Sequence, residues 1–362
     1  MLITRKKFPD IMIILDNIIF SLQRAGGISV FWQQLISYLL STSEDVRYIE
    51  HPSASDNIFR KELALPSSRI ITRPLYHKLI SQFLHPKVSS KEKFIFHSSF
   101  FRTCRNPKAI NVTTVHDFIY QQSSKMSLRQ RIRTGLNTRA ITESDAVVCV
   151  SENTKHDLLT YVPQVNPDIV HVIHNGVADS FRKLDHTPYP ELADHILYVG
   201  GRQSYKNFSF LLECIRDTRF SLIICGSALT DDEISRLNRE IPGRYRCVTY
   251  PTNDELNMIY NSVFALAYPS SYEGFGIPVI EAQRCGCPVI ALNASSIPEI
   301  IGDKTLLMNN LSQQEFSDKI DILLNNSLKS DVVSKGLDNS KRFSWERMAR
   351  EYVNLYDTLL VK

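Results

Sequence analysis

Two consecutive series of alternating strand and helix patterns constrain the fold of this chain more than any other feature of its sequence. In the first series, β-branched runs such as residues 11–20, 110–116 and 146–150 are typical of buried parallel strands, with helical patterns such as 128–142 between them. A second series of the same kind begins near residue 195. The sequence therefore predicts an α/β protein with two doubly wound parallel sheets. A length of 362 residues suits two domains of roughly 150 residues each.

The segment between the two series marks the expected domain boundary. Residues 179–194 are polar, contain Pro188 and Pro190, and lack periodicity. We expect a first Rossmann-like domain over residues 1–180 and a second over residues 191–344. Residues 345–362 show an amphipathic helical pattern that no strand follows, so this helix needs a surface to cover.

Composition and charge narrow the functional classes. No apolar run approaches the ~20 residues of a membrane span. The seven scattered cysteines lack the spacing of zinc ligands and suit a reducing compartment. The net charge of +4 combines a basic excess before residue 180 with an acidic excess after it, which indicates that one domain meets an anion. We do not expect this anion to be nucleic acid, because the aromatic residues do not interleave with the basic ones.

The strongest candidate for a binding site follows the expected strand 264–268. Ligands of open parallel sheets bind beyond the carboxyl ends of the strands, and Glu273 lies in such a loop, followed by Gly-Phe-Gly and then Pro278, which suits a helix start. Glu281 lies about one turn inside that helix. The glycines bring backbone N–H groups close to a ligand, and a helix N-terminus favours an anionic or hydroxyl-rich one. Two carboxylates could thus grip two parts of one elongated ligand; the alternative is a capping Glu and a solvent-facing Glu.

Two glycine-rich loops are further candidates for anion binding. Gly201 and Arg202 follow the first strand of the second series, and Lys206 comes shortly after; a planar guanidinium and a point charge together suit a diphosphate. Gly26 and Gly27 precede a helix of the first series, which is a phosphate-binding arrangement. Neither the dinucleotide fingerprint nor a P-loop is completed there. A basic solvated loop and an ordinary tight turn are the respective alternatives.

A His-Asp pair closes the expected strand 110–116. His116 and Asp117 would point toward the ligand-binding edge of the first sheet, although a histidine at a strand end can also be a polar residue with an ordinary hydrogen bond. No Ser or Cys occupies a nucleophile elbow, and no cluster of metal ligands is visible.

Together these motifs resemble those of retaining glycosyltransferases of family 4, which have the GT-B fold. The matching stretches are the E-x7-E module Glu273–Glu281, Arg202 with Lys206, the Asn-Gly-Val of residues 175–177 and the Val-Ser-Glu-x-Thr-Lys of residues 150–155. One departure is Ala294-Ser-Ser-Ile-Pro-Glu299, where the family often has Gly-Gly before Pro-Glu. The resemblance implies two Rossmann-like domains that face each other across a cleft, with the C-terminal helix crossing back onto the first domain.

The resemblance also implies a role for each candidate residue. Arg202 and Lys206 would hold the diphosphate, Glu273 the hydroxyls of the donor sugar, and His116 would touch the transferred sugar, so these four would be the catalytic residues. Glu281 would bind the donor ribose. The other donor-binding residues would be Phe275, Gly276, Ile277, Gly26, Gly27, Asp117 and Gly201. Family members need no metal or other cofactor, and the donor nucleotide would be GDP, with UDP and dTDP left open.

The acceptor side is less defined. The run Lys125–Arg139 carries five basic residues and no acid, and its apolar residues recur every four positions. A face that is solvated or binds an acceptor phosphate is one interpretation, and a helix on an anionic membrane surface is the other.

The resemblance implies a retaining hexosyltransferase for surface polysaccharide of the O-antigen or capsule type. Mannose, or a deoxyhexose such as rhamnose, would pass to a saccharide carried on a polyprenyl diphosphate, at the cytoplasmic face of the inner membrane. Two other classes stay open: a non-catalytic protein of the same fold that binds sugars or lipid carriers, and a nucleotide-sugar epimerase. Turnover of a donor would distinguish the transferase from the non-catalytic protein, and dependence on an acceptor would distinguish it from the epimerase.

Overall fold

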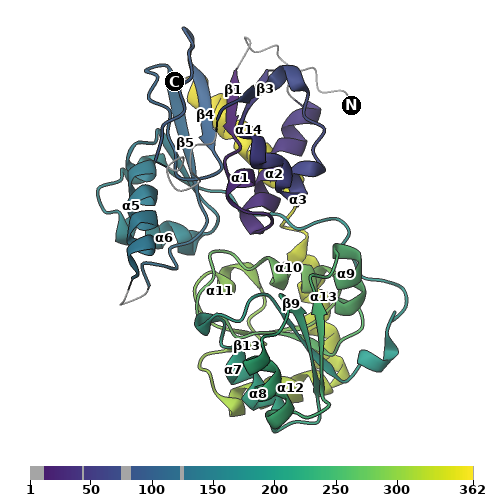
Figure 1. The fold of residues 1–362 in the computed structure, drawn as a ribbon. Helices are drawn as coiled ribbons and strands as arrows, with labels where there is room; N and C mark the ends of the chain where they lie inside the picture. Colours follow the sequence, from purple (N-terminus) through teal and green to yellow (C-terminus); the bar gives the residue numbers. More distant parts are fainter. Residues whose placement is uncertain (1–11, 43–44, 75–82, 123–125, 362) are drawn as a thin grey trace. The chain divides into compact units, whose positions relative to one another are not determined.

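The computed structural model describes residues 12–42, 45–74, 83–122 and 126–361, and it contains two compact units, each built on its own sheet (Figure 1). The first unit comprises Met1–Asn175 and Trp345–Lys362, and the second comprises Gly176–Ser344. Both sheets are entirely parallel in their recorded strand pairs, which confirms the predicted α/β class and, with it, the predicted pair of Rossmann-like domains.

The first sheet has the order β3-β2-β1-β4-β5-β6-β7. Its strands are β1 (Ile13–Asp16), β2 (Val46–Glu50), β3 (Ile70–Thr72), β4 (Phe94–Ser98), β5 (Ala109–Val115), β6 (Ala146–Cys149) and β7 (Val170–Val172). Every residue of the central strands β1 and β4 is buried, which explains why these strands read as continuous apolar runs. The order reverses direction between β1 and β4, so this is the switch point where ligands of such sheets bind.

The second sheet has the order β10-β9-β8-β11-β12-β13. Its strands are β8 (His195–Val199), β9 (Ser221–Gly226), β10 (Tyr245–Thr249), β11 (Ala265–Tyr268), β12 (Val289–Leu292) and β13 (Leu307–Met308). The switch point of this sheet lies between β8 and β11, the two strands that precede the predicted donor-binding loops.

Helices connect the strands of both sheets, as parallel pairing requires. The helices among the described residues of the first unit are α1 (Ile19–Leu22), α2 (Gly27–Thr42), α3 (Ile58–Lys61), α5 (Leu128–Thr142), α6 (Glu152–Tyr161) and α14 (Trp345–Val361), which follows the last strand. In the second unit they are α7 (Phe208–Arg216), α8 (Asp231–Glu240), α9 (Asn253–Tyr260), α10 (Ile277–Arg284), α11 (Ile297–Ile300), α12 (Gln313–Leu324) and α13 (Asn326–Ser340).

The apolar run at residues 11–20 is not one strand, as the sequence predicts, but a strand followed by a short helix. Residue 11 lies outside the described residues, β1 ends at Asp16, and α1 begins at Ile19. Ile19 and Phe20 are as buried as the strand itself. An apolar run of this kind does not distinguish a buried strand from a buried helical turn, because both surround their side chains with core.

The C-terminal helix α14 belongs to the first unit, as predicted, and packs beside α2 and β4 (Figure 1). Two buried tyrosines anchor it. The Tyr356 hydroxyl lies 2.6 Å from His97 Nδ1, and the Tyr352 hydroxyl lies 2.8 Å from Thr114 Oγ1. His97 Nε2 in turn lies 3.0 Å from the same Thr114 oxygen, so a buried hydrogen-bond network joins the last helix to β4 and β5.

Residues 176–180 pack with the second unit, although the sequence assigns them to the end of the first. The Arg284 guanidinium, at the end of α10, contacts the carbonyl oxygen of Ala178 at 3.3 Å and the Asp179 carboxylate at 3.1 Å. These contacts bind the connecting segment to the second unit just after Asn175.

Candidate active site

The loop between β11 and α10 has a backbone shape that only glycine allows at its end. Gly276 directly precedes α10 with φ of +110°, and a Cβ atom there would come within 2.8 Å of Ile297 Cδ1. Phe275 is buried beside it, and Pro278 lies in the first turn of the helix. The N-terminal end of α10 is thereby exposed to the loop that carries Glu273, as the motif predicts.

Two serines hold this loop in place. Ser295 Oγ accepts a hydrogen bond from the Glu273 backbone N–H at 2.8 Å, and Ser296 Oγ donates to the carbonyl oxygens of Glu273 and Phe275 at 2.9 and 2.8 Å. Ser295 has φ of +48°, a left-handed conformation that glycine adopts more easily. Ser295 therefore keeps a glycine-like backbone, whereas Ser296 has an ordinary helical one with φ of −73°, and the hydroxyls of both fix the loop.

Lys206 and Glu273 form an ion pair across the switch point of the second sheet. Lys206 follows β8 and Glu273 follows the neighbouring strand β11. Only 15% of the Lys206 side chain and 13% of the Glu273 side chain are exposed. The Lys206 ammonium also lies 5.7 Å from the centre of the Tyr268 ring, within reach of a cation–π contact. The structure thus brings together two of the predicted catalytic residues.

Asn207 links the same two loops by its side chain. With φ of +52° it precedes α7, and its Nδ2 atom donates to the Pro269 carbonyl oxygen at 2.8 Å and to Ser271 Oγ at 2.6 Å. The Ser271 backbone N–H donates to the Tyr205 carbonyl oxygen at 2.8 Å. These bonds fix the position of Lys206 relative to Glu273.

Arg202 is bound to a different carboxylate. Its Nε and Nη2 atoms lie 2.6 and 3.0 Å from the two oxygens of Glu233, in the first turn of α8, and Nη2 donates to the Ala228 carbonyl oxygen at 2.8 Å. Only 6% of the Arg202 side chain is exposed. The bidentate bond holds the pKa of Glu233 below its usual range. The sequence predicts Arg202 beside Lys206 on a diphosphate, whereas the structure gives the two cations separate partners.

Glu281 lies on α10 against a buried tyrosine. The Tyr260 hydroxyl donates to Glu281 Oε2 at 3.0 Å, and burial raises the pKa of Glu281 to about 7. The hydroxyl bond opposes this rise but is the smaller effect. Glu281 therefore changes its charge near neutral pH.

In the first unit, His116 and Asp117 follow β5. The His116 ring packs edge-on against Phe31 of α2, with the ring centres 5.0 Å apart, and burial lowers its pKa to about 4. The imidazole is therefore neutral at physiological pH. Asp117 is exposed, and its Oδ1 accepts a hydrogen bond from the Ile119 N–H at 3.1 Å. These two residues line one cavity with residues of the loop after β4 and of α5.

The remaining predicted donor-binding residues lie at loop ends. Gly26 and Gly27 stand where α2 begins, and Gly201 precedes Arg202 after β8. Phe275, Gly276 and Ile277 form the turn into α10.

Four further residues shape the site although the sequence analysis assigns them no role in it: Asn207, Ser295, Ser296 and Tyr260. The first three are polar residues in loops beyond strand ends, and this position is the signal that points to them.

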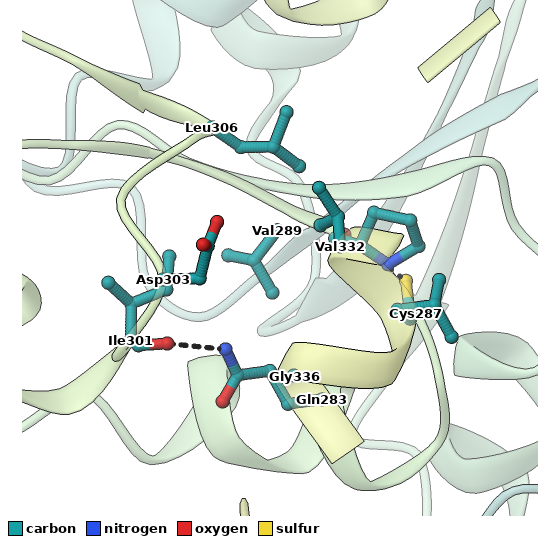
Figure 2. Close-up of a pocket in the computed structure, with 10 residues that line it drawn as sticks. Gln283, Cys287, Val289, Ile301, Asp303, Leu306, Val332 and Gly336 are labelled. Carbon is teal, nitrogen blue, oxygen red and sulfur yellow. Dashed lines mark hydrogen bonds between the residues drawn. The ribbon is translucent and has the colours of Figure 1, made fainter. Parts of the chain in front are cut away.

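A small cavity in the second unit, shown in Figure 2, belongs to the packing of α13 on α10. Gln283 crosses it and donates to the Ile301 carbonyl oxygen at 2.8 Å, while Asn339 Nδ2 donates to Gln283 Oε1 at 2.8 Å. Most of the lining is aliphatic. The packing of α13 on α10 and the hydrogen bonds of Gln283 hold α10, and with it Glu281, in place.

Within residues 12–42, 45–74, 83–122 and 126–361, no group of three or more His, Cys, Asp or Glu could hold a metal ion. In those ranges no helix is both long and apolar enough to cross a bilayer.

Family models match both units of the chain. The model described as "Glycosyltransferase Family 4" matches residues 25–181, and the model described as "Glycosyl transferases group 1" matches residues 185–337. The two matches divide the chain near the boundary between its two units.

One curated relative is the O-antigen chain mannosyltransferase B of Escherichia coli, which is 32% identical over 177 residues. The match covers 46% of this chain and 46% of that protein, so the chain spans about half the length of the curated relatives it matches. Among solved structures, the sucrose-phosphate synthase of Thermosynechococcus elongatus has a TM-score of 0.76 at 19% identity and covers 97% of this chain and 99% of its own. Anabaena HepE in complex with UDP and glucose has a TM-score of 0.70 at 14% identity and covers 95% and 99%.

Proposed function

We propose that this chain, a glycosyltransferase of the GT-B fold and the family 4 type, moves a hexose from a nucleotide-diphosphate sugar to a saccharide acceptor with retention at the anomeric carbon. The observation that carries the proposal is the Lys206–Glu273 ion pair at the switch point of the second sheet. This is where open parallel sheets bind nucleotides, and the N-terminal end of α10 adds partial positive charge there.

The donor would lie along the loop between β11 and α10 and along α10 itself. Glu281 would accept hydrogen bonds from the ribose hydroxyls, and Lys206 would contact the diphosphate. Glu273 and the backbone N–H groups of Phe275, Gly276 and Ile277 would hold the donor sugar. Ser295 and Ser296 support this assignment, because they fix the loop before any ligand arrives.

The transfer breaks the bond between the anomeric carbon and the diphosphate oxygen and forms a bond from that carbon to an acceptor hydroxyl. The electron pair of the broken bond stays with the diphosphate, which gains negative charge, and the acceptor proton passes to a phosphate oxygen. Lys206 stabilises that charge most where it is greatest, in the transition state. We propose that Arg202 adds to this stabilisation, which requires the phosphates to compete with Glu233 for its guanidinium.

His116, from the first unit, would touch the transferred sugar. Its pKa of about 4 means that it acts as a neutral hydrogen-bonding group and not as a cation. Gly26 and Gly27 would approach the phosphates, and Asp117 a sugar hydroxyl. We propose that catalysis needs no metal.

Mannose is our first choice for the sugar and GDP for the nucleotide, and the name of the Escherichia coli relative supports mannose. Because HepE, which shares the fold, was solved with UDP and glucose, UDP is the second choice. We propose a polyprenyl-diphosphate-linked acceptor, an O-antigen or capsule-type product, and work at the cytoplasmic face of the inner membrane.

The test is turnover of a donor panel. GDP-mannose, UDP-glucose and dTDP-rhamnose are each incubated with the full chain, and release of the nucleoside diphosphate is measured with and without a saccharide acceptor. We expect one donor to be consumed, with acceptor-dependent release and no metal requirement. Conversion of a donor into its epimer without an acceptor would establish the epimerase instead, and binding without turnover the non-catalytic protein.

A further inference from the structure

Another pocket of the first unit lies away from the strand ends at which ligands of parallel sheets bind. Its described walls are Arg139 in the last turn of α5, Arg105 and Asn106 just before β5, and the segment Phe83–Val88. A helix between two parallel strands returns the chain to the amino ends of the strands, so the last turn of α5 marks that edge. The pocket measures about 580 Å³ and is partly open to solvent, which is in the size range of small-ligand sites.

The Arg139 guanidinium is the first observation that indicates a ligand. Its Nε and Nη2 atoms are buried, and neither has a hydrogen-bond partner among the described residues. These two atoms form the edge of a guanidinium that can bind an oxyanion through two parallel N–H donors. Buried N–H donors are nearly always paired, because an unpaired donor loses its hydrogen bonds to water without replacement. The helix dipole favours a cation in this turn of α5 but uses neither donor.

Three other arginines show how this chain otherwise uses the same edge. In each of them, Nε and Nη2 contact the two oxygens of a single carboxylate; the pairs are Arg60–Glu50, Arg102–Asp16 and Arg202–Glu233. No Asp or Glu occurs among the described residues that line the pocket of Arg139. Glu143, one turn further along the chain, accepts a hydrogen bond from Thr103 Oγ1 at 2.5 Å instead. An oxyanion from outside would therefore complete at Arg139 the arrangement that the protein completes internally at the other three.

The other polar side chains of the pocket also suit a phosphate. Lys87 and Arg105 are exposed and add two cations to that of Arg139. His85 Nδ1 lies 2.9 Å from the Thr103 carbonyl oxygen, and His85 Nε2 is buried without a hydrogen-bond partner among the described residues. A ring that donates through Nδ1 keeps a lone pair on Nε2, which can accept the O–H of a singly protonated phosphate.

The apolar side chains beside these cations indicate what the phosphate is attached to. Phe83 and Leu84 are each 44% exposed, and Pro86 and Val88 complete this wall of the pocket. An aliphatic group that covered them would remove apolar surface from water. The pocket therefore combines an anion site with an apolar surface.

We propose that this pocket binds an aliphatic phosphate ester at a site separate from the donor site. Arg139 would turn its Nε–Nη2 edge into the pocket and hold two phosphate oxygens, and Phe83 and Leu84 would cover the aliphatic group. The proposal goes beyond the proposed function and does not depend on it, because none of these residues takes part in donor binding. A water-soluble ester and a lipid headgroup share this chemistry, and the test distinguishes them.

Binding to the full chain is measured by titration calorimetry with hexyl phosphate, inorganic phosphate and hexanol. We expect hexyl phosphate to bind about tenfold more tightly than inorganic phosphate, and hexanol more weakly than either. Arg139→Gln should weaken hexyl phosphate about tenfold or more, and Arg139→Lys less, because lysine keeps the charge and loses the fork. Arg131→Gln is the matched control, since it removes an exposed arginine from the same helix. Thermal melting checks that every variant is folded.

Three results would overturn the proposal: no binding of hexyl phosphate, equal binding of hexyl phosphate and hexanol, or equal affinity in Arg139→Gln and Arg131→Gln. Because the proposed donor site also takes phosphates, Lys206→Ala locates the ligand. Unchanged affinity for hexyl phosphate in Lys206→Ala supports the new site, and a loss there with none in Arg139→Gln contradicts it. Binding of hexyl phosphate at Arg139 without turnover of any donor would remove the proposed function alone.

Sedimentation with vesicles distinguishes the two sources of the phosphate. Vesicles of phosphatidylcholine with and without phosphatidic acid are mixed with Arg139→Gln and with Arg219→Gln, which removes an exposed arginine from the second unit. If a lipid headgroup occupies the site, Arg139→Gln should sediment less than Arg219→Gln with the vesicles that contain phosphatidic acid. Equal sedimentation of the two variants, with hexyl phosphate still weakened by Arg139→Gln, would assign the site to a water-soluble ester.

Discussion

The two units carry their candidate sites at the same edge of similar sheets but surround the cations differently. In the second unit, Lys206 and Arg202 are each bound to a carboxylate, Glu273 and Glu233. In the first unit, Arg133 lies against aromatic rings. A ligand of the second unit must therefore share its cation with a protein carboxylate, whereas the Arg133 guanidinium forms no ion pair within the part of the chain that the structure describes. Paired cations suit a ligand with several charges and strong contacts elsewhere, such as a nucleotide diphosphate.

We expect the largest loss of turnover when Lys206 is replaced. Lys206→Ala should lower turnover about 100-fold or more, because it removes the cation nearest the charge that develops on the leaving diphosphate. It also leaves Glu273 largely buried without its partner, so the variant should melt at a lower temperature. Turnover is measured as nucleoside diphosphate release from the accepted donor.

The double variant Lys206→Met/Glu273→Gln separates the two effects, since it removes the unpaired carboxylate as well. We expect its melting temperature to recover while its turnover stays low. Lys341→Ala, which breaks an exposed ion pair with Asp338, is the control. Near-normal turnover in Lys206→Ala would contradict the assignment.

Glu281 should make the nucleotide affinity of the second unit depend on pH. With a pKa of about 7 its carboxyl is mostly neutral below pH 7 and ionised above, and only the ionised form makes charge-assisted bonds to ribose. Nucleotide affinity should therefore rise about tenfold between about pH 6 and about pH 8, given the tenfold change in ionised fraction. Glu281→Gln should bind about tenfold more weakly at the higher pH and show little pH dependence, measured by titration calorimetry.

The same raised pKa means that the folded protein binds this proton more readily than the unfolded chain. Its contribution to stability is present at low pH and is lost as pH rises through about 7, so Glu281→Gln should also flatten the dependence of stability on pH. An unchanged pH profile in the variant would show that Glu281 does not bind the nucleotide.

Arg202 should matter less for turnover than Lys206. Its guanidinium joins the loop after β8 to α8 through Glu233 and Ala228, so Arg202→Ala should lower the melting temperature by several degrees while turnover falls about tenfold or less. Arg219→Ala, at an exposed ion pair with Asp194, is the control. A loss of turnover as large as that in Lys206→Ala, without loss of stability, would show that Arg202 acts on the diphosphate and has no structural role.

Ser295 tests whether the donor loop is preorganised. Ser295→Gly and Ser295→Ala both remove the hydroxyl that receives the Glu273 N–H, so kcat/KM should fall a few-fold in each. Only glycine relieves the backbone at φ of +48°, so the alanine variant should be the less stable of the two. Steady-state kinetics and thermal melting read out the two effects, and unchanged kinetics in both would show that the loop needs no such support.

The smallest effect concerns α5. Arg129 and Arg131 are exposed, with Leu128 and Ile132 exposed beside them. Arg129→Gln/Arg131→Gln should reduce sedimentation with anionic vesicles a few-fold at low salt, since each basic residue at such a surface contributes ~1 kcal/mol and salt screens it. Lys125 of the same run lies outside the described residues. Equal binding to neutral and anionic vesicles would exclude a membrane role for this helix.

The fold and the position of the Glu273 loop before a helix could be predicted from the sequence because their signals are local. Buried parallel strands read as apolar runs, and the Glu273 loop combines glycine, proline and carboxylates within nine residues. The partners could not be predicted, because Glu233 reaches Arg202 from a separate helix and Ser295 reaches Glu273 from the loop after the next strand. The cavity that His116 lines was equally hidden, because its aromatic rings lie in the loops after β4 and β5 while Arg133 and Asn137 lie on α5, and these segments share no motif.

The central claim is that the second unit binds the donor nucleotide. The nucleotide affinities of variants in the two units test this claim most directly. GDP, UDP and dTDP are titrated into the wild-type chain, and the best ligand is then titrated into Lys206→Ala, Glu281→Gln and Arg133→Gln. We predict that one nucleotide binds more tightly than the others, that the first two variants weaken it, and that Arg133→Gln leaves its affinity unchanged. Absence of binding for all three nucleotides, or weakening by Arg133→Gln with none by Lys206→Ala and Glu281→Gln, would contradict it.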